Sequence, residues 1–291
     1  MSLSVKQLAN KEYVDNIDFD IFNMQTDILM DSAVTIVGKR RSGKSELIRN
    51  IAYELRNKVK DVYLFSGTAD TQMDFWNFVP IENVYKGLNE EKLDDIFESQ
   101  KEMIQQAEAD GNKDKSTLPY VMIIFDDVIK GAQGVRHSDK LAFMYCNGRH
   151  FNVLSMLCVQ GYKSCSPQVR ENTDVSIAFR FKNQNTSEDF VKENFNCSSD
   201  IGRRIMTKIC EDDENPHQCI VVLAHLRTGN IEKQIKKYTA QIITDQFVIN
   251  NKSVMKVVQE YKTPLFKKEK AKKPRALKSA YDVPSFDPDE E

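Results

Sequence analysis

Several features that would place this sequence of 291 residues in a specialised class are absent. The longest apolar runs, at residues 120–125 and 219–224, have the length of β-strands, whereas a membrane-spanning helix needs roughly 20 apolar residues. The first residues carry Lys6 and Lys11 and no apolar segment of the kind found in signal peptides. We therefore expect no membrane span and no secretory leader.

The six cysteines are scattered and include no C-x-x-C pair. Zinc sites and disulfide frameworks usually show paired or regularly spaced ligands, so we expect neither, and a reducing compartment is the natural environment. The formal net charge is −2, so the overall balance does not by itself indicate a nucleic-acid-binding protein. Hydrophobic residues make up 41% of the chain, which is ordinary for a globular protein with a sizeable core.

Short apolar runs typical of β-strands alternate with amphipathic segments along most of the chain. Strands are predicted at residues 33–37, 62–66, 120–125, 153–159 and 175–181, and helices at residues 46–58, 90–106 and 139–146. This alternation favours an α/β fold built from parallel βαβ units. Residues 219–226 and 231–238 predict an antiparallel hairpin at the sheet edge, and a helix is predicted over residues 245–261.

The first predicted strand leads into a complete phosphate-binding motif. Residues 38–45 read GKRRSGKS, which matches G-x-x-x-x-G-K-[ST], and an amphipathic helix follows. Glycines let the backbone N–H groups point at phosphates, the lysine reaches the β- and γ-phosphates, and the serine hydroxyl binds Mg²⁺. The predicted nucleotide-binding residues are Gly38, Arg41, Ser42, Gly43, Lys44 and Ser45, with Ser45 also a ligand of Mg²⁺.

A second part of the site is predicted where the strand over residues 120–125 ends in Asp126 and Asp127. Ligands of open α/β sheets bind at the carboxyl ends of the strands, so Asp126 is placed to anchor Mg²⁺. Asp127 is the candidate general base or water-positioning carboxylate, and the alternative is a loop or helix-capping residue. Together with the phosphate loop, the two acids predict a P-loop NTPase with a Mg²⁺ site, and a small-molecule kinase, a switch GTPase and a motor ATPase stay open at this point.

The sequence lacks the marks of two other classes of P-loop protein. It has no guanine-reading NKxD motif, since the nearest string, KNQN at residues 182–185, contains no acid. It also has no arginine-rich lid of the kind that small-molecule kinases use. The adjacent acids Asp126 and Asp127 instead suit an enzyme that activates water for hydrolysis.

Four ordered motifs carry a resemblance to a known family. They are GKRRSGKS at residues 38–45, IIFDDV at 123–128, GRHFNVLSMLCVQ at 148–160 and SPQVRENTDVSIAF at 166–179. Over residues 33–181 the sequence resembles the FtsK/HerA superfamily of P-loop NTPases. Within it, the chain looks most like the genome-packaging ATPases of nucleocytoplasmic large DNA viruses of the poxvirus, iridovirus and asfarvirus type. The resemblance implies a RecA-like fold in which helices flank a mostly parallel central sheet, with the predicted C-terminal β-hairpin and charged tail after it.

The resemblance also implies roles for individual residues in catalysis. Gln160 would be a polar sensor that contacts the γ-phosphate or the attacking water, and Arg149 and Arg170 are candidates for an arginine that reaches a neighbouring subunit's nucleotide. An arginine acting in trans requires a homo-oligomeric ring, a pentamer or a hexamer. The alternatives are that Arg149 pairs with an acid and that Gln160 only caps a strand.

The sequence departs from the cellular members of the superfamily in two ways. It has Asp126-Asp127 where many of them carry Asp-Glu, so the shorter side chain of Asp127 reaches less far. It also lacks an arginine near Ser176, which moves the search for a trans-acting arginine to Arg149 or Arg170.

The implied function is ATP-driven translocation of double-stranded viral DNA into a capsid. Its partners would be the DNA and capsid or virion proteins, and its location the virion and the host-cell cytoplasm at the assembly site. Two alternatives stay open, a nucleotide-gated scaffold in virion assembly and a helicase or conjugation-type DNA pump.

Composition divides the chain into an N-terminal segment (residues 1–30), a P-loop ATPase domain (31–262) and a flexible charged tail (263–291). Residues 262–278 contain eight basic residues and one acid, Glu269. Such a run predicts an arm that binds nucleic acid or an acidic partner, and the alternative is a solvated tail or a stretch that resembles a nuclear-localisation signal.

Overall fold

A computed structural model of the chain describes residues 12–72, 75–128, 135–226 and 228–244, together with residues 246, 247 and 249. Within this part of the chain, eight strands form one sheet in the order β3-β2-β4-β5-β1-β6-β7-β8. The strands are β1 (Ala33–Val37), β2 (Val59–Ser66), β3 (Val84–Lys86), β4 (Tyr120–Asp126), β5 (Val153–Val159), β6 (Val175–Ala178), β7 (Gln218–Leu223) and β8 (Ile235–Thr239). All neighbours from β3 to β6 are parallel, whereas β7 runs antiparallel to both β6 and β8.

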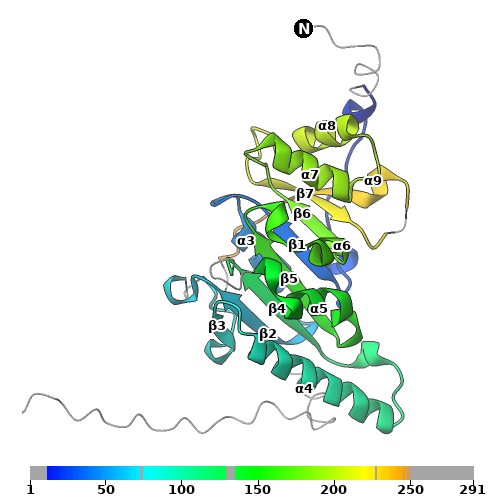
Figure 1. Cartoon of the computed structure of the whole chain (residues 1–291). Coiled ribbons are helices and arrows are strands. Elements are labelled where there is room, and N and C mark those ends of the chain that lie inside the picture. The colour runs from blue at the N-terminus through cyan, green and yellow to red at the C-terminus, as the bar shows by residue number, and fades with distance from the viewer. Residues whose placement is uncertain are drawn as a thin grey trace, which may run out of the picture.

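Helices pack against the sheet along its whole width (Figure 1). They are α2 (Met24–Asp27), α3 (Lys44–Leu55), α4 (Glu90–Ala109), α5 (Asp139–Asn147), α6 (Pro167–Glu171), α7 (Gln184–Asn194), α8 (Ser199–Cys210) and α9 (Ile231–Gln234). Apolar side chains of α2 and α3 join one hydrophobic core, and those of α4 to α8 join a core on the opposite face. Among the described helices, none is both long and apolar enough to cross a membrane.

Side chains alternate between the two cores along each strand, as a pleated sheet requires. In β4, Val121, Ile123 and Phe125 belong to the core under α4 to α8, while Met122 and Ile124 belong to the core that includes α3. None of the five is more than 1% exposed. Burial on both faces explains why the central strands are continuous apolar runs in the sequence.

Polar residues determine where several helices begin. Asn89, Ser138, Asn183 and Ser198 are the N-cap residues of α4, α5, α7 and α8, and each side chain accepts a hydrogen bond from a backbone N–H of the first turn. Such a bond satisfies a donor that the helix itself leaves unpaired, which stabilises the helix by about 1 kcal/mol.

The sheet confirms the predicted α/β class and the antiparallel pair at its edge, but single elements differ from the prediction. The pair is β7 and β8, and residues 231–234, predicted as strand, form the short helix α9 before β8 begins at Ile235. The strand predicted over residues 175–181 ends at Ala178. Helix α7 was missed because it buries only Phe190 and Val191, too few residues to produce a helical apolar pattern.

Residues 12–30, which belong to the predicted N-terminal segment, pack against the rest of the domain. The backbone N–H of Phe22 donates to the carbonyl of Lys237 at 2.9 Å, and the N–H of Lys237 donates to the carbonyl of Asp20 at 2.9 Å. The Lys208 ammonium donates to three carbonyl groups within residues 14–17 at 2.6–2.9 Å. The predicted helix over residues 245–261 and the predicted tail over 263–291 lie outside the described residues, apart from residues 246, 247 and 249.

Candidate nucleotide site

The carboxyl edge of the sheet brings most of the predicted site residues together. The phosphate loop follows β1, Asp126 ends β4, and Gln160 follows β5. Strand β5 lies between β1 and β4 and is parallel to both. Gln160 therefore lies between the phosphate loop and the two acids, which is the place where a γ-phosphate on the loop would meet the Asp126 carboxylate.

The phosphate loop has a backbone and a packing that require glycine at two positions. Gly43 has a φ of 105°, in the left-handed region that glycine adopts without strain. A Cβ at Gly38 would lie 2.5 Å from the Oγ of Ser42 and 3.0 Å from a ring carbon of Phe179. The Oγ of Ser42 is buried and has no hydrogen-bond partner among the described residues. An unpaired buried hydroxyl is costly, so the loop fits a role in which a further group, such as a phosphate, supplies its partner.

The Lys44 side chain forms hydrogen bonds with the backbone of the phosphate loop. Its Nζ donates to the carbonyl oxygens of Gly38 at 2.7 Å and Lys39 at 2.9 Å. Helix α3 begins at Lys44, and its N-cap, Gly43, has no side chain that could satisfy the N–H groups of the first turn. These N–H groups and the ammonium are the donors that an anion at a helix N-terminus uses.

Asp126 is the buried acid of the site, with 6% of its surface exposed. Burial raises the pKa of its carboxyl group to about 6, the Lys44 ammonium lowers this pKa, and the neighbouring Asp127 raises it. Carboxylate and hydroxyl oxygens are the ligands that Mg²⁺ prefers. The Ser45 hydroxyl and the Asp126 carboxylate would therefore hold Mg²⁺, which would neutralise charge on the phosphates.

Asp127 and Gln160 are in direct contact beside this acid. The Nε2 of Gln160 donates to Oδ1 of Asp127 at 3.3 Å. Asp127 has a φ of 50°, a left-handed conformation that aspartate tolerates better than most residues. Its turn lies against Gly67, where a Cβ would come within 2.4 Å of the Asp127 carbonyl oxygen. The amide and the carboxylate form a polar pair that is open to solvent and able to orient a water molecule.

The two predicted arginines do not join this site within one protomer. Arg149 is exposed and precedes β5, so it lies at the amino edge of the sheet, roughly 20 Å from the phosphate loop along the strand. The Nε of Arg170 donates to Oε2 of Glu193 at 2.7 Å, and its NH1 donates to the Cys165 carbonyl at 2.7 Å. With its side chain only 12% exposed, Arg170 is held inside its own protomer, which argues against the predicted reach into a neighbour.

Two contacts of the phosphate loop were not predicted from the sequence. His217 precedes β7, and its Nδ1 lies 3.2 Å from the carbonyl oxygen of Ser42, so the tautomer protonated at Nδ1 donates to the loop. The Phe179 ring, which follows β6, lies against both loop glycines. No local sequence signal marks these residues, because only the order of β1, β6 and β7 in the sheet places them beside the loop.

Comparison with known proteins places the chain in a family. The family model described as Poxvirus A32 protein matches residues 20–263. An uncharacterized protein of Invertebrate iridescent virus 3 is 26% identical over 172 residues, which cover 57% of this chain and 62% of that protein. An uncharacterized protein of Frog virus 3 is 25% identical over 218 residues, which cover 75% of this chain and 64% of that protein. These matches confirm the predicted resemblance, and each spans less than two thirds of the relative's own length.

A solved structure supports the fold. The pCW3 conjugation coupling protein TcpA, solved in its monomer form with ATPγS, superimposes with a TM-score of 0.54 at 13% sequence identity. The superposition covers 80% of this chain and 66% of that one. It confirms the predicted P-loop architecture, in which a mostly parallel sheet is flanked by helices.

Proposed function

The chain belongs to the Poxvirus A32 protein family, and we propose that its P-loop ATPase domain drives double-stranded viral DNA into a capsid. The proposed partners are the DNA itself and capsid or virion proteins. The proposed location is the assembly site in the host-cell cytoplasm, and the virion. Residues 31–262 form the motor domain in this proposal, and the basic part of the tail predicted over 263–291 is an additional contact for an acidic partner.

One observation carries this proposal. Strand β5 lies between β1, which leads into the phosphate loop, and β4, which ends in the two acids, so Gln160 after β5 contacts Asp127 after β4. An acid with a neighbouring amide, facing a phosphate loop, can hold water in line for attack on a γ-phosphate. In this scheme Lys44 binds the β- and γ-phosphates, and Ser45 and Asp126 hold Mg²⁺. Asp127 accepts the proton of the attacking water, and Gln160 orients that water.

We assign the trans-acting arginine to Arg149. A side chain at the amino edge of the sheet is too far from the phosphate loop of its own protomer, but it can enter the site of a neighbour in a head-to-tail ring. Arginine suits the role because its planar guanidinium is always charged and neutralises charge that grows in the transition state. Arg170 lacks this freedom, since Glu193 and the Cys165 carbonyl bind its guanidinium.

The experiment that tests the proposed function is steady-state ATP hydrolysis with and without long duplex DNA, with Lys44→Ala as the inactive control. The proposal expects duplex DNA to raise the rate, and the Lys44→Ala variant to lose both the basal and the stimulated rate. Hydrolysis that stays indifferent to duplex DNA over a range of salt concentrations would contradict a DNA-driven motor.

The two alternatives predict different results in the same setting. A nucleotide-gated scaffold binds ATP and thereby changes its affinity for virion proteins, but duplex DNA does not raise its rate of ATP hydrolysis. A helicase displaces one strand of a forked duplex, whereas a packaging motor moves along intact duplex without separating it. A strand-displacement assay on forked DNA therefore distinguishes the helicase from the motor.

A further inference from the structure

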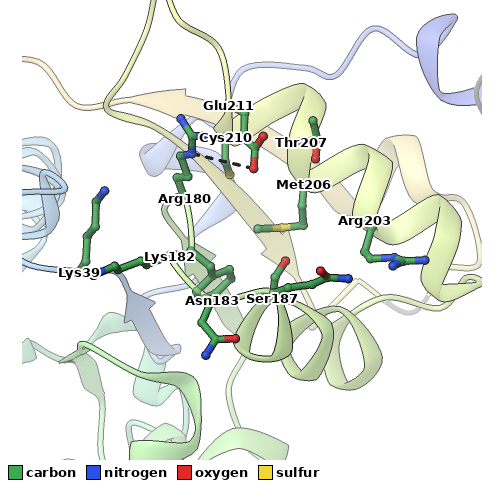
Figure 2. Close-up of a pocket in the computed structure, with 12 residues that line it drawn as sticks. Lys39, Arg180, Lys182, Asn183, Ser187, Arg203, Met206, Thr207, Cys210 and Glu211 are labelled. Carbon is green, nitrogen blue, oxygen red and sulfur yellow. Dashed lines mark ion pairs between the residues drawn. The ribbon is translucent and has the colours of Figure 1, made fainter. Parts of the chain in front are cut away.

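A basic pocket opens beside the phosphate loop, on the side of β1 that faces β6 and away from Asp126. Its volume is about 540 Å³. Residues 180–184 and Ser187 lie on one side of it, four residues of α8 on another, and Lys39 of the phosphate loop at its border (Figure 2). We refer to it as the basic pocket, defined by Lys39, Arg180, Lys182 and Arg203.

The charge of the basic pocket is only partly compensated. Lys39 and Lys182 are exposed, and neither forms an ion pair with an acid in the described ranges. Arg180 lies 3.9 Å from Glu211, the one acid among the described lining residues, and the Arg180 side chain remains 53% exposed. Arg203 lies 3.5 Å from Glu188 and 3.9 Å from Asp200. Exposed contacts of this length contribute little, so the pocket keeps a positive field that attracts anions.

Other groups in the lining suit phosphate oxygens. Asn183 is the N-cap of α7, a helix of 11 residues, so the positive end of this helix faces the same pocket. Ser187 and Thr207 add hydroxyl groups. Among the described residues that line the pocket, Phe181 is the only aromatic one, and it packs on the hydrophobic core, so these residues offer no pair of rings as a slot for a nucleotide base. The lining therefore fits a phosphate chain better than a free nucleotide.

Lys39 links the basic pocket to the nucleotide site through its own backbone. Its side chain lines the pocket, and its carbonyl oxygen accepts a hydrogen bond from the Nζ of Lys44 at 2.9 Å. An anion that draws the Lys39 side chain into the pocket would pull on the Lys39 backbone, whose carbonyl oxygen holds the Lys44 ammonium. Binding in the pocket can thus change how readily Lys44 turns toward a nucleotide phosphate.

We infer that the basic pocket binds phosphates of the duplex DNA backbone and that Lys39 couples this contact to the ATPase site. The inference rests on the proposed function and deepens it, because it names the surface through which DNA would stimulate hydrolysis. Contacts to phosphates carry no sequence information, which suits a motor that must move any stretch of a genome.

The test compares Arg180→Gln/Lys182→Gln with the control Lys101→Gln/Lys192→Gln, which removes the same charge from exposed positions on α4 and α7 outside the pocket. For the pocket variant we expect duplex affinity to fall roughly 10- to 100-fold near 0.1 M salt, and the slope of log K against log[salt] to shrink by about 2. Basal hydrolysis and the affinity for a fluorescent ATP analogue should match those of the unaltered protein. Saturating DNA should restore full stimulation.

Lys39→Gln tests the coupling. It removes one phosphate contact, so the salt slope should shrink by about 1, but full stimulation should not return at saturating DNA. If Lys39→Gln binds DNA less tightly yet reaches the full stimulated rate at saturating DNA, the coupling through Lys39 is overturned.

Three results would overturn the assignment of the basic pocket to DNA phosphates. In the first, the pocket variant binds duplex DNA like the unaltered protein, and in the second, the control variant loses as much DNA affinity as the pocket variant. In the third, the pocket variant loses affinity only for ATP, which would assign the pocket to the nucleotide. Unaltered protein that neither binds duplex DNA nor responds to it would instead overturn the proposed function, and the pocket with it.

Discussion

Gln160 donates a hydrogen bond from its Nε2 to Oδ1 of Asp127 at 3.3 Å, although the two residues are 33 positions apart in the sequence. They meet because β4 and β5 are parallel neighbours and both residues follow the carboxyl ends of these strands. The amide donates to one carboxylate oxygen, and the other oxygen, which accepts no hydrogen bond from a described residue, can accept a proton. In the proposed mechanism Asp127 is the base, and Gln160 orients the water that Asp127 deprotonates.

The first prediction concerns this pair. Gln160→Ala should lower kcat roughly 10- to 100-fold and leave the Kd for ATP nearly unchanged, because it removes a group that positions water and not one that binds the nucleotide. Asp127→Asn should lower kcat more, roughly 100- to 10,000-fold, because the amide cannot accept the proton. Single-turnover hydrolysis and equilibrium nucleotide binding check both.

Gln168→Ala, at an exposed position of α6, is the matched control. An equal loss of ATP affinity in Gln160→Ala would show that Gln160 binds nucleotide instead.

The second prediction concerns the packing of the phosphate loop. In Gly38→Ala the new methyl group would lie 2.5 Å from the Oγ of Ser42, so the loop must shift. Such strain costs about 1–3 kcal/mol, which corresponds to a loss in nucleotide affinity of roughly 5- to 150-fold. Titration with a fluorescent ATP analogue measures the change. Gly229→Ala should bind the analogue like the unaltered protein, because a Cβ there meets no atom of the described residues within 4 Å.

The third prediction concerns Arg149. If it acts on a neighbour's nucleotide, Lys44→Ala and Arg149→Ala should each be nearly inactive alone, whereas a mixture of the two should recover activity. In the mixture some sites combine an intact Lys44 from one subunit with an intact Arg149 from the next. ATPase assays of mixtures at fixed total protein, with gel filtration to confirm assembly, measure this recovery. A mixture no more active than its two components would argue against an arginine acting in trans.

The fourth prediction concerns the stability of the fold as a function of pH. Burial raises the pKa of Asp61 from 3.8 to about 6, nearby Lys60 lowers this pKa, and Glu82 raises it. Since the folded protein holds this proton more tightly than the unfolded chain, Asp61 favours folding below about pH 4, and this contribution is lost as the pH rises through about 6. Relative to Asp61→Asn, the unaltered protein should therefore lose about 2 kcal/mol of unfolding free energy between pH 4 and pH 7.

Urea unfolding at several pH values measures this difference. Glu102→Gln, which removes a carboxyl group from an exposed position of α4, is the matched control. A constant offset between Asp61→Asn and the unaltered protein, with no dependence on pH, would contradict the prediction.

The sequence by itself determined the parts of this protein that depend on short stretches of chain. The phosphate loop could be predicted because Gly38, Gly43, Lys44 and Ser45 act within one turn between a strand and a helix. The central strands could be predicted because burial on both faces requires an uninterrupted apolar run, as in β4. The antiparallel pairing of β7 and β8 was also predicted, although the turn residues alone did not reveal the short helix α9 between them.

Only the tertiary structure decided which of these parts meet. The order of strands placed β5 between β1 and β4, and thereby joined Gln160 to Asp127 and aligned both with the phosphate loop. The same order brought His217 and Phe179 against the loop, and it left Arg149 at the opposite edge. Strand order depends on how buried faces pack over long sequence separations, and no local pattern of residues encodes that choice.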